Sequence, residues 1–249
     1  MSPASGAQPL YAQVEAVLAA AIQDGALAPG ACLPPELELT QRFGVSRTTI
    51  RQTIQNLVRR GLVEIRRGRG TYVSEPKIAQ ELTELSGFVE DMQAVGRTAS
   101  AKVLSTEIVP ASEAVANKLE LAIGTPVVRI ARVRLADDRP ISLDETYLPR
   151  ALGEQVLRHD LAREAIFPLL EEQYDTPLIE AEYRLEAVAA TSSVARALNV
   201  AEGSPIFLIE RTSYSTDRRP VDYEKLHYRG DQVQFVTRLA RRNAPKSQA

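Results

Sequence analysis

Residues 35 to 74 constrain the fold of this chain more than any other stretch. Pro35 and Glu36 are typical of a helix start, and Gly44 and Gly61 each stand where a periodic run of apolar residues ends. Two short helices are therefore predicted, with Ser46 as the N-cap of the second. The second helix repeats apolar side chains at helical spacing, at Ile50, Ile54, Leu57 and Val58. A basic β-hairpin with a glycine-containing tip is expected to follow.

The charge of this segment differs from that of the whole chain. Between residues 42 and 69 there is one acid, Glu64, and there are eight arginines, at positions 42, 47, 51, 59, 60, 66, 67 and 69. The full chain, by contrast, has a formal net charge of −2. Such a local excess is typical of a surface that binds the DNA backbone. Arg47, Thr48 and Arg51 fall on the polar side of the second helix, whose first turn reaches base edges in helix-turn-helix proteins. A solvated helix face that binds nothing is the alternative, but the short turn and the basic tip together favour DNA recognition.

These residues resemble the winged helix-turn-helix domain of the GntR family of bacterial transcription regulators. The resemblance runs from about Pro9 to Ser74 and rests on PLYAQV, GALAPGACLPPE, FGVSRTTIRQTIQNLVRRGL and RRGRGTYV. It implies base or phosphate contacts from Glu36, Arg47, Thr48 and Thr49, a backbone contact from Arg51, and minor-groove contacts from Gly68 and Arg69. We therefore expect a winged-helix domain over residues 9–75. The resemblance also implies a homodimer on double-stranded DNA with a palindromic operator.

Length and composition predict a second domain. A chain of 249 residues with 44% hydrophobic residues can bury two cores, and no stretch approaches the length of a membrane span. Cys32 is the single cysteine, so a disulfide framework is not expected. These features predict a cytoplasmic protein without membrane contact. We place a linker at residues 76–85 and the second domain at residues 86–241.

The second domain contains an internal repeat. Shifting residues 101–139 by 79 positions, without gaps, gives 13 identities, among them Arg132 with Arg211. Each copy predicts a strand, a helix capped by Ser112 or Thr191, and a β-hairpin. Duplication completes one sheet, because a single copy has too few strands to bury its own face. Two such copies also leave a cleft between them, where small ligands bind.

The first hairpin supplies candidate ligand-binding residues. Arg132 and Arg134 end an otherwise apolar face of its first strand. A four-residue loop at residues 136–139 would place Glu145 on this arginine face, whereas a register slip of one residue would place Asp144 there. Guanidinium groups beside a carboxylate suit an anionic molecule that bears hydroxyl groups. An ordinary cross-strand ion pair on a solvated sheet is the alternative.

Residues 80–240 resemble the effector-binding domain of the HutC subfamily of the GntR family. This domain is called UTRA, and its fold is similar to that of chorismate lyase. The resemblance rests on SGFVEDMQAVGR, VLSTEIVPAS, ARVRLADDRPISLDETYLP, EAVAAT and RPVDYEKLHYRGDQVQF. It implies a site for a small anionic metabolite such as a sugar phosphate, formed by Arg132, Arg134, Glu145, Asp222 and Tyr228. The backbone amides around Ser86, Gly87 and Phe88, which precede a predicted helix, would receive the anion.

The sequence thus predicts an α+β protein: a winged helix-turn-helix followed by a mixed α/β domain of two repeat units. We expect a repressor that a metabolite releases from DNA, with no cofactor. His159 and His227 have no metal-ligand spacing, so neither a metal site nor catalytic residues are predicted. The alternatives are a chorismate-lyase-like enzyme domain fused to a DNA-binding head, and a DNA-architectural protein without a ligand.

Overall fold

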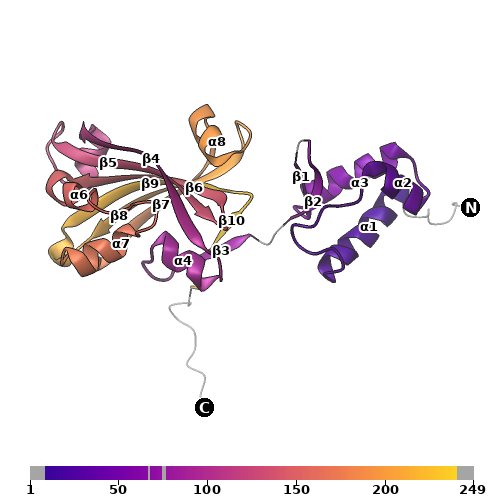
Figure 1. The fold of residues 1–249 in the computed structure, drawn as a ribbon, viewed down its shortest axis with the longest axis horizontal. Coiled ribbons are helices and arrows are strands. Elements are labelled where there is room, and N and C mark those ends of the chain that lie inside the picture. Colours follow the sequence, from indigo (N-terminus) through magenta and orange to yellow (C-terminus); the bar gives the residue numbers. More distant parts are fainter. Residues whose placement is uncertain (1–8, 67, 75–76, 240–249) are drawn as a thin grey trace, which may run out of the picture. The chain divides into compact units, whose positions relative to one another are not determined.

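The computed structural model describes residues 9–66, 68–74 and 77–239. The chain divides into two compact units, residues 1–76 and 77–249. The first is mainly helical with a small hairpin, and the second is built around a large antiparallel sheet (Figure 1). The expected α+β class is confirmed.

The first unit has the predicted helix-turn-helix and hairpin. Its elements are α1 (Leu10–Gln23), α2 (Glu36–Phe43), α3 (Arg47–Arg59), β1 (Val63–Arg66) and β2 (Gly70–Val73). Ser46 caps α3 by accepting from the Thr49 N–H, and Gly44 ends α2 in the left-handed region with φ of 64°. Leu39, Ile50 and Leu57 are completely buried in a core shared by the three helices and the hairpin. Of the apolar stripe predicted for α3, Ile50, Ile54 and Leu57 are buried and hold the unit together, whereas Val58 is 37% exposed. The side of α3 that carries Arg47 and Arg51 faces solvent.

The second unit contains a six-stranded antiparallel sheet in the order β4-β5-β6-β9-β8-β7. Its strands are β4 (Ala99–Pro110), β5 (Pro126–Ala136), β6 (Arg139–Pro149), β7 (Glu180–Ala189), β8 (Pro205–Tyr214) and β9 (Pro220–Arg229). Its helical segments are α4 (Phe88–Ala94), α5 (Glu113–Leu119), α6 (Arg150–Val156), α7 (Ile166–Pro168), η1 (Leu169–Gln173), α8 (Ser192–Leu198) and η2 (Thr216–Arg218). The short strands β3 (Ile78–Glu81) and β10 (Val233–Val236) pair in parallel beside this sheet.

The internal repeat corresponds to a structural repeat. The first copy runs β4-α5-β5-β6 and the second runs β7-α8-β8-β9, so that β6 and β9 meet at the centre of the sheet. Ser112 caps α5 and Thr191 caps α8, as the sequence predicted. Both helices end on a residue with φ of 54°, Glu120 or Asn199. The two copies are therefore equivalent down to the backbone of their helix ends.

The two faces of the sheet are covered by different helices. Apolar side chains of α5 and α8 pack on one face, and those of α4, α6 and α7 pack on the other (Figure 1). At Gly153, α6 approaches β5 so closely that an added Cβ would lie 2.4 Å from the Val128 Cβ. No helix among the described residues is both long and apolar enough to cross a membrane.

The segment expected to be a linker contains a strand. Residues 78–81, within the expected linker at 76–85, form β3 and pair with β10 near the C-terminal end of the described chain. Gln80 is buried, and Ile78 belongs to a core cluster that includes Phe88. This part of the chain is thus packed into the second unit. Residues 75 and 76 lie outside the described part.

Candidate functional site

The first turn of α3 presents polar side chains to solvent. Arg47 and Thr48 are exposed, and Arg47 has no ion-pair partner among the described residues. Thr49 is half-buried, and its hydroxyl lies 2.9 Å from the Ser46 Oγ within the helix cap. Of these side chains, Arg47 is the one with guanidinium donors fully available to an external acceptor.

Arg51 and Glu36, both expected to contact DNA, contact each other. The Arg51 Nε donates to the Glu36 Oε2 at 3.0 Å, and this pair joins α3 to the first turn of α2. The Arg51 side chain remains 65% exposed, so its other donors can still reach a phosphate. The pair therefore fixes the direction of Arg51 and offsets part of the local positive charge.

The hairpin supplies the expected basic tip. Gly68 has φ of 75°, a conformation that favours glycine, and both Gly68 and Arg69 are exposed. The Arg66 guanidinium stacks 4.3 Å from the Tyr72 ring centroid and pairs with Glu64, which leaves Arg69 as the freer cation of the described tip. The expected arginine at position 67 lies outside the described residues.

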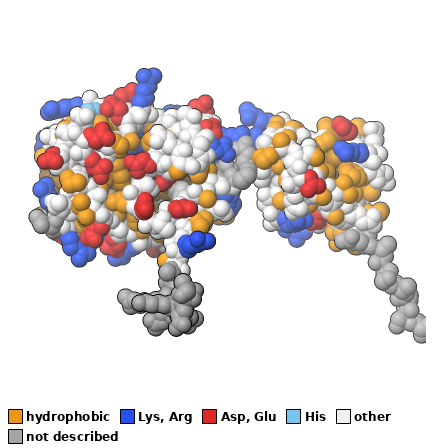
Figure 2. Space-filling model, turned by 90° about the horizontal axis from the view of Figure 1, so that it is seen from below, with side chains coloured by type: hydrophobic (Ala, Val, Ile, Leu, Met, Phe, Trp, Pro, Cys, Tyr) orange, Lys and Arg blue, Asp and Glu red, His pale blue; other side chains and the backbone are white. Residues whose placement is uncertain are grey.

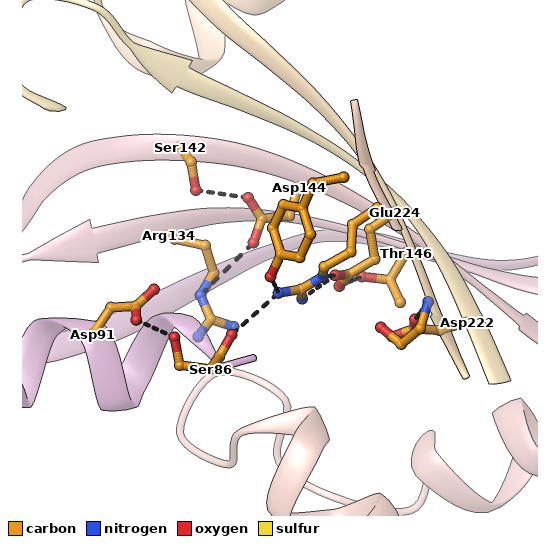
Figure 3. A network of polar contacts seen from close by, with 12 residues as sticks. Ser86, Asp91, Arg134, Ser142, Asp144, Thr146, Asp222 and Glu224 are labelled. Carbon is orange, nitrogen blue, oxygen red and sulfur yellow. Dashed lines mark hydrogen bonds and ion pairs between the residues drawn. The ribbon is translucent and has the colours of Figure 1, made fainter. Parts of the chain in front are cut away.

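The second unit buries a cluster of charged side chains between its sheet and α4 and α7. Arg132 and Arg134 come from β5, Asp144 from β6, Arg211 from β8 and Glu224 from β9. All five are buried, and several are joined by hydrogen bonds and ion pairs (Figure 3). Two larger hollows of about 360 and 310 Å³ lie elsewhere on the unit, but none of the residues that line them has a buried polar atom without a partner. The charged cluster is therefore the better candidate for a binding site.

The carboxylate beside the β5 arginines is Asp144, and the expectation of Glu145 at this place is wrong. Next to the loop, Leu135 pairs with Pro140, as a four-residue loop requires. Ile141 is then an extra residue in β6 and shifts the register by one. Arg132 consequently stands opposite Asp144. Glu145 consequently points to the other face of the sheet, where its Oε1 accepts from the Arg129 Nη2 at 2.6 Å. A β-bulge of one residue therefore changed which acid enters the site.

Sequence reasoning missed Arg211 and Glu224. The Arg211 guanidinium donates from both Nε and Nη2 to the Glu224 Oε2, and its Nη1 donates to the Ser86 carbonyl at 3.2 Å and to the Tyr183 hydroxyl at 3.1 Å. The identity of Arg132 and Arg211 in the repeat was a signal that could have located this half of the site, since equivalent strand positions face the same side.

The other residues expected in the site take different places. Asp222 is completely buried two residues before Glu224, and its Oδ1 accepts from the Ser213 N–H at 3.2 Å. Tyr228 does not line the pocket, because it packs edge-to-face on Phe235 within an apolar cluster.

The start of α4 already satisfies part of the expected anion site. The Gly87 N–H donates to the Glu90 Oε2 at 2.9 Å, and the Ser86 hydroxyl donates to Asp91. Phe88 lies with its ring 4.8 Å from the Arg134 guanidinium carbon. These residues line or adjoin the pocket, but the Gly87 amide has an internal carboxylate as its partner.

The pocket is small. Its cavity is about 30 Å³, which holds a water molecule or two, whereas sites for small ligands measure roughly 300–1,000 Å³. Phe88 covers Arg134, and Phe167 lies over Arg211 at 4.5 Å. A metabolite can therefore enter only when these aromatic side chains or the segments that carry them move.

The half of the pocket formed by the first repeat is cationic. Burial and the charge of Arg134 lower the pKa of Arg132 to about 10, so Arg132 stays charged near neutral pH. Burial raises the pKa of Asp144, although the two guanidinium groups oppose this shift. The Nε atoms of Arg132 and Arg134 are buried without hydrogen-bond partners. Such orphaned donors are uncommon and suit an acceptor that arrives from outside.

The second repeat contributes two buried carboxylates, of which Glu224 lines the pocket with Arg211 and Asp222 does not. Burial raises the pKa of Asp222 to about 7, and the charge of Glu224 adds to this shift. Burial also opposes ionisation of Glu224, but the Arg211 charge and hydrogen bonds from Thr146 and Arg211 hold its pKa below the ordinary value. Glu224 is therefore ionised at neutral pH, and Asp222 is poised between its two states.

The charged pocket differs from the outer surface. Acidic and basic side chains are both scattered over the face of the second unit that Figure 2 shows, as on an ordinary solvated surface. No group of three or more His, Cys, Asp or Glu side chains among the described residues is arranged to hold a metal ion. The arrangement suits binding of a charged organic molecule through hydrogen bonds.

Two family models match this chain. The model described as bacterial regulatory proteins, gntR family, matches residues 10–73, and the UTRA domain model matches residues 94–234. The first match covers α1 to β2, and the second covers the six-stranded sheet. Both fall where the sequence motifs placed them.

Individual relatives agree with these matches. The chain is 35% identical over 228 residues to the HTH-type transcriptional repressor NagR of Bacillus subtilis, which spans 92% of this chain and 93% of NagR. It is 29% identical over 236 residues to the histidine utilization repressor of Pseudomonas putida, spanning 95% and 94% of the two chains. The crystal structure of PhnF from Mycobacterium smegmatis superposes with a TM-score of 0.65 at 27% identity and covers 91% of this chain and 99% of PhnF.

Proposed function

Because this chain belongs to the gntR family of bacterial regulatory proteins and carries a UTRA domain, we propose that it is a repressor released from its operator by a small anionic metabolite. The chain is a DNA-binding transcription regulator of the HutC type and not an enzyme, as its relatives are named transcriptional repressors. The observation that carries the proposed release is the buried arginine cluster, in which the Nε atoms of Arg132 and Arg134 have no hydrogen-bond partner.

On the DNA side, we propose a homodimer in the cytoplasm that binds a palindromic operator, with one first unit on each half-site. Arg47 and Thr48 on the first turn of α3 would read bases, and Gly68 with Arg69 at the hairpin tip would enter the minor groove. Thr49, Glu36 and Arg51 complete this surface, with the ion pair holding Arg51 against α2. Arginine supplies most of the expected affinity, because each phosphate contact releases counterions.

On the metabolite side, the proposed ligand is an anion such as a sugar phosphate. Arg132 and Arg134 would bind its oxygens in bidentate fashion, and Asp144 and Glu224 would accept hydrogen bonds from its hydroxyl groups. Asp222, expected to contact the ligand, does not line the pocket. Relatives named as repressors of sugar-linked systems, such as the mannosyl-D-glycerate transport/metabolism repressor MngR of Escherichia coli, motivate this choice. The pocket must widen to admit such a molecule, so ligand binding selects a conformation other than the one described above.

A chain of hydrogen bonds leads from the pocket to β3, the first strand after residues 75 and 76. The Arg211 Nη1 donates to the Ser86 carbonyl, the Ser86 hydroxyl donates to Asp91, and the Asp91 Oδ2 accepts from the Gln80 Nε2 at 3.1 Å. Gln80 lies on β3 and is buried. A ligand that pulls Arg211 away from Ser86 would therefore disturb the hydrogen bonds that reach Gln80 on β3. This strand is where the second unit begins. This route would carry the release signal.

The test is DNA binding and its reversal by a metabolite. Full-length protein should bind duplex fragments from the region upstream of its own gene at low ionic strength, and a member of a panel of sugar phosphates should release it. Fluorescence anisotropy measures both steps on one sample. Failure to bind any upstream fragment at low salt contradicts the DNA assignment, whereas tight binding that no anionic metabolite reverses contradicts the proposed release.

A further inference from the structure

The hollow of about 360 Å³ is formed by three segments of the second unit that are far apart in the sequence. They are Pro149 with α6, residues 174–176 after η1, and the hairpin between β8 and β9. Its volume falls in the range of roughly 300–1,000 Å³ that small-ligand sites occupy. No residue that lines this hollow also lines the charged pocket, so the two are separate places.

The apolar side of the hollow is rigid. Leu152, Tyr174 and Val221 line it and belong to one apolar cluster. The Tyr174 hydroxyl donates to the Gln155 carbonyl at 3.1 Å and lies 2.7 Å from the His159 Nε2. Because its hydroxyl is held by the protein, the Tyr174 ring is fixed in place and offers a preformed aromatic surface to an occupant.

The polar side chains of the hollow are available to an occupant. Five of them make no hydrogen bond or ion pair with the described residues: Gln155, Asp175, Ser215, Thr216 and Arg219. Two of the five are charged. Asp175 follows η1 and supplies an anion, whereas Arg219 belongs to the hairpin and supplies a cation. The hollow therefore combines an apolar surface with one group of each charge, carried by different segments.

We infer that this hollow is a second small-molecule site, which binds a zwitterionic amino acid with an apolar side chain. The carboxylate of the ligand pairs with Arg219 and its ammonium group pairs with Asp175. Its apolar side chain packs against Leu152, Tyr174 and Val221. A molecule with only one of the two charges leaves the other protein group without a partner and binds more weakly. This site is distinct from the effector site proposed above and does not depend on it.

Three probes that share a phenylethyl skeleton test this inference. L-phenylalanine carries both charges, hydrocinnamate lacks the ammonium group, and phenethylamine lacks the carboxylate. Titrations of isotope-labelled full-length protein, followed by the NMR signals of backbone amides, locate each probe and give its dissociation constant. L-phenylalanine should shift the amides of Asp175, Thr176 and Thr216 and leave that of Arg132 unchanged. It should bind about threefold or more tightly than either other probe, as expected for one added charged contact at a partly exposed site.

Variants assign the two charges. Asp175→Asn should reduce the affinity for L-phenylalanine to that for hydrocinnamate, and Arg219→Ala should reduce it to that for phenethylamine. Asp138→Asn is the matched control, because Asp138 is also exposed and has φ of 63°, against 47° for Asp175. This control should leave all three affinities unchanged.

Several results would overturn the inference. They are no shift with L-phenylalanine at about 10 mM, shifts confined to residues outside the hollow, and equal affinities for the three probes. An unchanged ranking in folded Asp175→Asn and Arg219→Ala proteins would also overturn it. The wild-type ranking decides the matter if neither variant folds.

Discussion

The Nε of Arg51 on α3 donates to the carboxylate of Glu36 on α2, at 3.0 Å from Oε2. Removing the charge of Glu36 frees one more positive charge on the surface proposed to bind DNA. We expect Glu36→Gln to increase affinity for non-specific duplex DNA and to steepen the plot of log K against log salt by about 0.9, the value for one further phosphate contact. Titrations between 50 and 200 mM salt measure this slope. A slope equal to that of the wild type means that the loss of the Glu36 charge adds no phosphate contact.

Arg47 should contribute to specific recognition. Its side chain is exposed on the first turn of α3 and free of ion pairs with the described residues, so a bidentate base contact is available to it. Arg47→Ala should weaken operator binding by about 1–3 kcal/mol with little effect on non-specific DNA. Arg163→Ala, which removes an 88% exposed arginine from the second unit, is the matched control. Equal losses on specific and random duplexes would make Arg47 a phosphate contact.

The β5 arginines should affect release and not DNA binding. Arg132→Ala or Arg134→Ala removes a buried guanidinium group from the pocket while the first unit is unchanged. We expect operator affinity within about twofold of wild type and loss of metabolite-induced release, measured by anisotropy with the same DNA. A variant that still responds normally to the metabolite would remove its arginine from the site.

The features of this fold that the sequence predicts correctly are those that depend on short-range sequence patterns and on the internal repeat. The caps at Ser46, Ser112 and Thr191 follow from short-range hydrogen bonding, and the repeat predicted two equivalent halves of the sheet. The strand at residues 78–81 was not predicted, because it pairs with residues more than 150 positions later in the chain, and such a parallel partner leaves no local signal.

The site was less predictable because its composition depends on register. The bulge at Ile141 exchanged Glu145 for Asp144, and a hairpin sequence does not fix whether a strand carries an extra residue. Arg211 and Glu224 lie far from the first hairpin in sequence and meet Arg132 only when β6 pairs with β9. Asp222 was expected in the site from resemblance alone; its burial beside Glu224 is a property of the folded sheet.

Removing one partner of the buried ion pair between Arg211 and Glu224 should lower the free energy of unfolding of the second unit. Both side chains are buried, and the charge and hydrogen bonds of Arg211 help to hold the pKa of Glu224 below its ordinary value. Arg211→Ala should reduce the free energy of unfolding of the second unit by about 3–5 kcal/mol, because it leaves a buried carboxylate without its cation. The double change Arg211→Met with Glu224→Leu should recover much of this loss. Urea denaturation followed by circular dichroism measures both, with Arg184→Ala at an exposed pair as control.

If the double variant is no more stable than Arg211→Ala, the unpaired Glu224 carboxylate is not the main cause of the lost stability. The hydrogen bonds from Arg211 to Ser86 and Tyr183 would then account for the difference. Ser86 cannot replace this contact from its side chain, because its hydroxyl donates to Asp91.

Stability should depend on pH through Asp222. Its pKa is raised from 3.8 to about 7 in the folded chain, mainly by burial, so the folded state binds a proton that the unfolded state releases between these values. The free energy of unfolding of the second unit should therefore fall as pH rises from about 5 to 8. The lowered pKa of His227 acts in the opposite direction at pH values below its ordinary 6.5, so the informative quantity is the difference between wild type and Asp222→Asn. Urea titrations at pH 5, 6, 7 and 8 should give a flatter or rising profile for the variant, and parallel profiles would mean that Asp222 keeps its ordinary pKa in the folded protein.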